Sequence, residues 1–262
     1  MTEAMSHRIV TPEAGAPSGS SATTTNRTRA LLACGVVAGP LFLAVALLQA
    51  LTREGFDLRR HPLSLLSLGE LGWIQITNFV VAGLLLLAFA VGLRRVLQPG
   101  RGSTWGPLLI GAYGVGLIMG GVFVADAGAG FPLGAPAGAP EQLSWHGMLH
   151  AIAPVLAFLS LIVACFVLAR RLAGLGQRGW AGYCVATGVA LLGLLAWPYQ
   201  DTVVVQLAVA IVLGWAWLSA LAARLLTGLP GATKSINAPI AAAQDQPDAA
   251  GRGRSATRPT RR

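Results

Sequence analysis

Six long apolar runs constrain the fold of this chain more than any other feature of its sequence. They cover residues 30–51, 72–93, 105–125, 148–169, 180–199 and 203–223. Each holds about 20 residues, the length that an α-helix rising about 1.5 Å per residue needs to cross a hydrocarbon core of about 30 Å. The alternating segments of about 10 residues that a transmembrane β-barrel requires are absent. The sequence therefore predicts six membrane-spanning helices.

Composition and charge indicate the class of protein and its orientation. Of 262 residues, 54% are hydrophobic and only 11% are charged, which is typical of an all-α, polytopic membrane helix bundle. Most of the 19 basic residues lie before the first run or after the second, fourth and sixth runs. By the positive-inside bias, both termini are cytoplasmic (N-in, C-in) and the first, third and fifth connections face outward. The net charge of +9 is thus explained by topology, and no nucleic-acid partner is predicted.

The two ends of the chain differ in composition from the six runs. Residues 1–29 are rich in Ser, Thr, Ala and Gly and lack a cleavable apolar core, so we predict a disordered cytoplasmic N-terminus. Residues 30–226 form the transmembrane domain, and residues 227–262 read as a disordered basic tail. This tail either touches anionic lipid headgroups or serves only solubility and topology. We expect a multi-pass protein of the cell membrane, with the lipid bilayer as its partner.

Polar residues collect at the outer ends of the predicted helices. The first outward connection contains "RRHPLSLLSLG", residues 59–69, in which Pro62 suits the start of a short helix with an apolar stripe. Ionisable groups in membrane helices are costly and mark candidate sites. We predict a polar vestibule for a small or lipidic ligand, lined by Arg59, Arg60, His61, Ser64, Gln75, Asn78, Asp126, His146, His150 and Asp201.

Asp126 and the histidines allow two interpretations. A carboxylate at the end of the third helix is disfavoured by the helix dipole, so Asp126 should pair with Arg59 or Arg60. We predict that the loop folds back and brings Arg59, Arg60 or His61 within hydrogen-bonding reach of Asp126 or of the His146–His150 pair. In the alternative, His146 and His150, four residues apart on one helical face, bind zinc together with His61 or Asp126 and leave a position for an activated water. In the first interpretation the histidines are interfacial hydrogen-bonding residues and no cofactor is needed.

Several blocks of the sequence resemble a known family. They are "ACGVVAGPLF", "GFDLRRHPLSLLSLGELGWIQITNF", "WGPLLIGAYGVGLIMGGVFVADAGAGFP" and "SWHGMLH". These blocks look like the bacterial membrane family of domain of unknown function 998, over about residues 31–226. The resemblance implies an integral membrane protein with several helices. It supplies no activity and no catalytic residue.

A looser likeness suggests an enzymatic alternative. The intramembrane zinc hydrolases of the alkaline ceramidase and adiponectin receptor group also combine Ser, Asp and a His-x-x-x-His pair. Those proteins have seven spans and carry the pair on the last, whereas here it opens the fourth of six. Three functions are therefore considered: binding or moving a small or lipidic ligand, which we favour, zinc-dependent hydrolysis of a lipid-like substrate, and a structural subunit of a membrane complex.

Overall fold

The computed structural model describes residues 19–197 and 202–229. These residues form six α-helices and one short 3₁₀ helix, and they contain no β-strand. All six α-helices are long and apolar enough to cross a membrane, so the predicted all-α six-helix membrane bundle is confirmed. The helices are α1 (Gly19–Thr52), α2 (Gly72–Leu97), α3 (Trp105–Val122), α4 (Trp145–Gly174), α5 (Arg178–Ala196) and α6 (Val203–Thr227), and the 3₁₀ helix is η1 (Leu63–Ser67).

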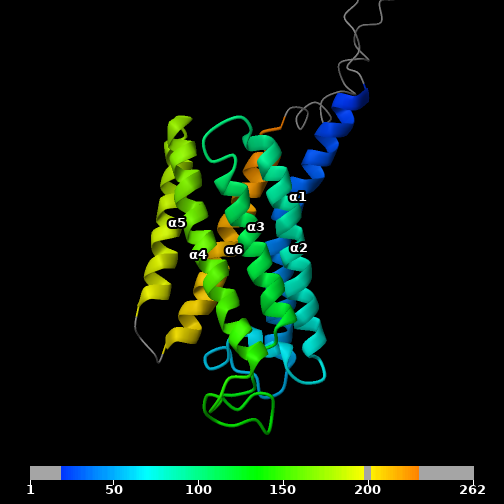
Figure 1. Ribbon diagram of the computed structural model, residues 1–262, viewed down its shortest axis with the longest axis vertical. Helices are drawn as coiled ribbons and strands as arrows, with labels where there is room; N and C mark the ends of the chain where they lie inside the picture. Colours follow the sequence, from blue (N-terminus) through cyan, green and yellow to red (C-terminus); the bar gives the residue numbers. More distant parts are fainter. Residues whose placement is uncertain (1–18, 198–201, 230–262) are drawn as a thin grey trace, which may run out of the picture. The chain divides into compact units, whose positions relative to one another are not determined.

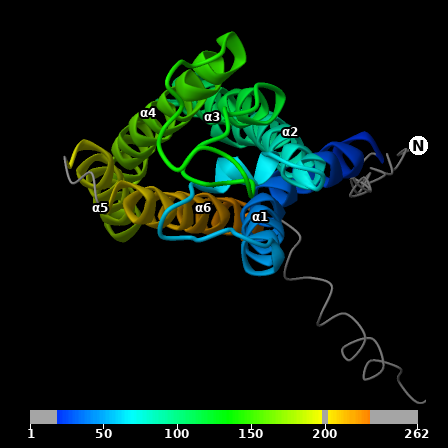
Figure 2. The same ribbon diagram turned by 90° about the horizontal axis from the view of Figure 1, so that it is seen from below.

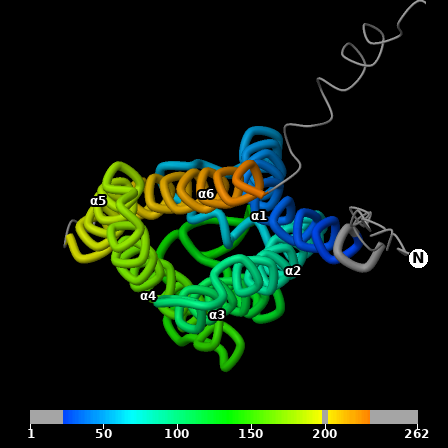
Figure 3. The backbone as a smooth tube through the Cα atoms, turned by 90° about the horizontal axis from the view of Figure 1, so that it is seen from above, coloured from blue at the N-terminus to red at the C-terminus, as the bar shows by residue number. Residues whose placement is uncertain are grey.

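Successive helices run in opposite directions, so α1 begins and α6 ends at the same end of the bundle (Figure 1). Consecutive helices from α1 to α5 pack against each other. Helix α6 returns to α1, where Trp215 and Ser219 approach Gly39. Viewed along their axes, the helices form a ring (Figures 2 and 3). We call the end that carries the connections 53–71 and 123–144 the distal end. It is the outer end in the predicted topology, and that orientation stays a prediction.

Several helix boundaries differ from the predicted ranges, and two of these differences change the description of a segment. Helix α1 begins at Gly19, so residues 19–29, which we expected to be disordered, belong to the first helix. Helix α3 ends at Val122, because the backbone becomes extended at Phe123, and Asp126 therefore lies in the connection rather than on the helix. The hydropathy pattern placed both boundaries too far along the chain, since helical hydrogen bonding need not end where apolar composition does.

Glycines allow α3 to pack closely on both of its neighbours. A Cβ atom at Gly83 of α2 would lie 2.6 Å from the carbonyl oxygen of Gly114 in α3. A Cβ atom at Gly116 would lie 2.9 Å from that of Ala157 in α4. Small residues at such contacts let membrane helices approach each other closely, which makes up for the missing hydrophobic driving force between helices in lipid. Helix α3 is therefore held between α2 and α4.

The two distal connections pack against each other. Arg53, directly after α1, donates hydrogen bonds to the carbonyl oxygens of Leu66 (3.0 Å) and Leu68 (2.6 Å). Its guanidinium also lies 5.3 Å from the ring centre of Phe131, which belongs to the second connection. Phe131 is only 1% exposed and meets Phe56 edge to face. These contacts hold η1 against the distal end of the bundle.

The chain divides into two compact units, Met1–Leu226 and Thr227–Arg262. The six-helix bundle belongs to the first unit. Most of the second unit lies outside the described residues, as do residues 1–18 of the predicted N-terminal segment. The predicted contact between the basic tail and anionic headgroups therefore stays a prediction.

Candidate functional site

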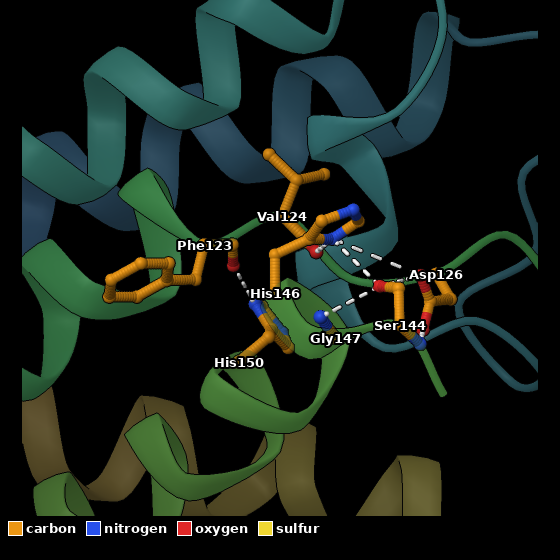
Figure 4. Close-up of polar contacts among 7 residues, drawn as sticks. All are labelled: Phe123, Val124, Asp126, Ser144, His146, Gly147 and His150. Carbon is orange, nitrogen blue, oxygen red and sulfur yellow. Dashed lines mark hydrogen bonds and ion pairs between the residues drawn. The ribbon is translucent and has the colours of Figure 1, made fainter. Parts of the chain in front are cut away.

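Asp126 is joined to the start of α4 (Figure 4). Its carboxylate accepts hydrogen bonds from the hydroxyl of Ser144 (2.5 Å) and from the backbone N–H of Ser144 (2.8 Å). Ser144 is the N-cap residue of α4, and its hydroxyl oxygen accepts a bond from the N–H of Gly147 (3.1 Å). The negative charge thus lies where a helix N-terminus stabilises it.

These hydrogen bonds shift the pKa of Asp126. The bonds from the Ser144 hydroxyl and backbone hold the pKa of the Asp126 carboxyl below its ordinary value. His146 Nδ1 lies 3.9 Å from the same carboxylate. Within the described part of the chain, neither Arg59 nor Arg60 forms a hydrogen bond or an ion pair with Asp126, and both arginines are exposed. The predicted arginine partner is therefore wrong, because the N-terminus of α4 already stabilises the carboxylate.

His146 and His150 bind the free carbonyl groups at the end of α3 (Figure 4). Nδ1 of His146 lies 3.1 Å from the carbonyl oxygen of Val124, and Nδ1 of His150 lies 2.7 Å from that of Phe123. A carbonyl oxygen only accepts hydrogen bonds, so Nδ1 of His150 carries the proton and donates. Nδ1 of His146 also lies 3.0 Å from the Ser144 hydroxyl, and because that hydroxyl donates its proton to Asp126, this Nδ1 donates as well. Phe123 is the C-cap residue of α3, whose carbonyl group lacks an intrahelical partner, and Val124 follows it. The two histidines supply partners for both carbonyl groups. The pair, together with Asp126 and Ser144, joins α3 to α4.

His61 lies in the first distal connection, residues 53–71, and forms no hydrogen bond with the group of Asp126, Ser144, His146 and His150. Its side chain is 3% exposed, with Nδ1 accepting from the backbone N–H of Asp57 (2.8 Å) and Nε2 lying 3.0 Å from the carbonyl oxygen of Ala129. The connection therefore folds back onto residues 123–144, as expected. However, the hydrogen bond that we predicted from Arg59, Arg60 or His61 to Asp126 or the two histidines is not formed among the described residues.

The predicted metal ligands are not gathered at one point. Among the described residues, no three His, Cys, Asp or Glu side chains are placed to hold a metal ion. Both ring nitrogens of His61 already engage backbone groups, and Nδ1 of His146 and of His150 is committed to a carbonyl oxygen. The set of His146, His150, His61 and Asp126 is therefore corrected to two separate structural groups, one at each distal connection.

Gln75 and Asn78 belong to a third polar group, buried between α1 and α2. The side-chain N–H of Gln49 donates to Oε1 of Gln75 (2.8 Å). Asn78 donates to the same oxygen (3.2 Å) and to the backbone carbonyl of Phe42 (3.1 Å). All three amides are at most 5% exposed. Gln49 is not among the residues predicted from the sequence, although it is the single amide within the first apolar run.

A cavity of about 90 Å³ lies inside the helix ring. Five helices contribute to its wall, and α5 does not. Each of the five supplies an aromatic ring: Phe42 of α1, Phe79 of α2, Tyr113 of α3, Phe158 of α4 and Trp215 of α6. The sequence did not reveal these residues as a group, because they are spread over the length of the bundle and share no spacing.

The distal end of this cavity carries the side chains of Ser64 and His150, and we call it the polar end, although Tyr113 and Trp215 add polar atoms farther along the wall. Pro62, Leu63 and Ser64 line the cavity from the first connection, and His150 lines it from α4. The structure thus brings Ser64 and His150 to one cavity, whereas the other predicted site residues that it describes belong to the structural groups above or, like Arg59 and Arg60, are exposed. Asp201, the remaining predicted residue, lies outside the described residues. The predicted polar vestibule is replaced by an apolar cavity with a polar end.

Six spanning helices around an internal cavity define a multi-pass integral membrane protein. The family comparison agrees with this class. The chain belongs to the family described as a protein of unknown function (DUF998), whose model matches residues 36–224, which confirms the resemblance seen in the sequence. Comparison with curated proteins and with solved structures gave no match.

Proposed function

We propose that this protein binds a small apolar molecule, or an apolar arm of a lipid, in the cavity inside its helix ring. The observation that carries the proposal is the cavity wall, in which five helices supply one aromatic ring each. Ligand sites are typically concave and mostly apolar, with a few polar groups that fix orientation. Ser64 and His150 are such groups here.

The energetics of packing support the same proposal. Protein interiors are close-packed, so a cavity of about 90 Å³ leaves the atoms of its wall without contact partners on one side. A ligand that fills the cavity recovers dispersion contacts with its wall. The cavity follows α6 from Leu207 to Trp215, which is about 12 Å at 1.5 Å per residue. A short hydrocarbon chain matches that length.

A cavity-filling variant tests this function. Gly120 lines the cavity, and a Cβ atom there would be 3.9 Å from Phe79 and 4.0 Å from Ala153, which are ordinary contact distances. Gly120→Leu should therefore fold and fill the cavity. The matched control is Gly182→Leu in α5, because Gly182 is an exposed helical glycine with no atom within 4 Å of its Cβ position.

The probe is 1-bromooctane, whose bromine quenches tryptophan fluorescence, added to the purified protein in lipid nanodiscs. We expect saturable quenching in the wild type and in Gly182→Leu, and its loss in Gly120→Leu. Trp215→Phe should remove most of the saturable component, because Trp215 is the tryptophan that lines the cavity. Equal, non-saturating quenching in the wild type and both leucine variants would show partition into lipid alone and would refute the proposal.

A further inference from the structure

Among the described residues that line the cavity, none carries a charged side chain of the Lys, Arg, Asp or Glu type. An ion inside a low-dielectric site needs a partner, because the cost of removing it from water is otherwise not compensated. An anionic or cationic head group would have no such partner in this wall. The charge pattern therefore favours an uncharged ligand.

The polar end of the cavity offers a specific hydrogen-bonding pattern. Nδ1 of His150 donates to the carbonyl oxygen of Phe123, so in the neutral ring Nε2 has a free lone pair and accepts. No described residue forms a hydrogen bond with this Nε2. Pro154, one turn along α4, has no N–H to donate to the carbonyl oxygen of His150, which leaves a second acceptor nearby.

Ser64 is the second polar residue of the polar end and lines the same cavity from η1. Its hydroxyl can either donate or accept. A ligand group that donates to His150 and exchanges a hydrogen bond with Ser64 fits both residues. A hydroxyl does this, whereas a carboxylate or a phosphate has only acceptors and would face the lone pair of Nε2.

We propose that the ligand is an uncharged amphiphile whose hydroxyl group binds between His150 and Ser64, with its hydrocarbon chain along α6 toward Trp215. This inference rests on the proposed function and names the chemical class of its ligand. The hydrocarbon chain would contact the aromatic wall, and the hydroxyl would lie at the distal end. Uncharged lipids that carry a hydroxyl group belong to this class.

Competition against 1-bromooctane in nanodiscs tests the class. The competitors are 1-octanol, octane, octanoate and octylammonium, each titrated and compared by the mole fraction in the bilayer that displaces half of the probe. One net hydrogen bond corresponds to about a three- to tenfold change in affinity. We expect 1-octanol to displace the probe at about three- to tenfold lower mole fraction than octane, and both ions to compete no better than octane.

Two variants assign the hydroxyl site. Ser64→Ala should reduce the preference for 1-octanol over octane, whereas Ser67→Ala should leave it unchanged, because Ser67 is a buried serine of the same 3₁₀ helix that does not line the cavity. His150→Phe should reduce the preference as well. The readout is a ratio within one variant, so a general loss of stability does not mimic the effect.

The outcomes separate this inference from the proposed function. If 1-bromooctane binds and octane competes as well as 1-octanol, the hydroxyl site is refuted and the apolar site remains. If octanoate or octylammonium displaced 1-bromooctane at a lower mole fraction than octane does, the inference that the ligand is uncharged would be refuted. If 1-bromooctane shows no saturable binding at all, the proposed function fails first.

Discussion

The hydroxyl of Ser144 and the carboxylate of Asp126 lie 2.5 Å apart, so the connection after α3 is bonded to the N-cap residue of α4. The same hydroxyl oxygen accepts the N–H of Gly147. Ser144 therefore accepts a hydrogen bond from a backbone N–H of α4 and also holds the Asp126 carboxylate at the positive end of the α4 dipole. The joint between α3 and α4 depends on this pair.

Replacing the cap should weaken the bundle measurably. We expect Ser144→Ala to lower the free energy of unfolding by about 1 kcal/mol, the usual cost of losing an N-cap side chain. Thr104→Ala is the matched control, since Thr104 is the N-cap residue of α3 and its side chain makes no capping bond. Thermal unfolding in detergent micelles would compare the two, and equal effects would contradict the role of Ser144.

The stabilisation by Asp126 should depend on pH. Its pKa is lowered in the folded protein by the bonds from Ser144, so its contribution is present above the ordinary Asp pKa of about 4 and is lost as pH falls below that value. The difference in melting temperature between wild type and Asp126→Asn should therefore be largest near neutral pH and shrink in acid. Glu141→Gln, at an exposed carboxylate of the same connection, is the control. A difference that grows in acid would reverse the assigned sign.

A methyl group at Gly147 should be harmful although alanine favours helices. A Cβ atom at Gly147 would overlap the carboxylate of Asp126, and overpacking typically costs about 1–3 kcal/mol. Gly174→Ala in the same helix has no atom within 4 Å of the new Cβ and should be neutral or stabilising by up to about 1 kcal/mol. Chemical unfolding measures the free energy of unfolding of both variants. A stabilised Gly147→Ala would show that Asp126 is not held tightly against the start of α4.

The buried amides of α1 and α2 should be energetically coupled. A double-mutant cycle with Gln49→Ala and Gln75→Ala should give a coupling of about 0.6 kcal/mol, the average for side-chain hydrogen bonds between membrane helices, with about 1.7 kcal/mol as an upper value. Gln49→Ala combined with Thr187→Ala in α5 should be additive within about 0.5 kcal/mol. Additivity in the Gln49–Gln75 cycle would show that their bond contributes nothing to stability.

Cysteine labelling in intact cells tests the orientation of the bundle. With Cys34 changed to serine, an impermeant thiol reagent should label Gly134→Cys in the connection 123–144 and should leave Gln177→Cys unlabelled, because the basic residues flank the second position. Cys165 and Cys184 are buried and should not contribute. The reverse pattern would place both chain ends outside.

The joint between α3 and α4 shows how far sequence reasoning about the site could reach. His146 and His150 share a helical face, and this is visible from their spacing alone. Ser144 before an apolar run is also a readable N-cap signal. The dipole of α3 alone does not identify the partner of Asp126, because the N-terminus of α4 lies beside the carboxylate. Arg59 and Arg60 have the opposite charge to Asp126, but they do not lie in contact with it.

The sequence by itself determined the six spanning helices and the family, because the length and hydropathy needed to cross a bilayer are properties of each segment alone. Tertiary structure decided which polar groups meet. Gln49 reaches Gln75 across two helices, and His61 reaches Ala129 across two connections. The cavity likewise exists only when five helices close around it, with Phe42 and Trp215 brought together from the first and last of them. Such contacts depend on how helices pack, and packing is set by the fit of side chains distant in the chain, which no local pattern records.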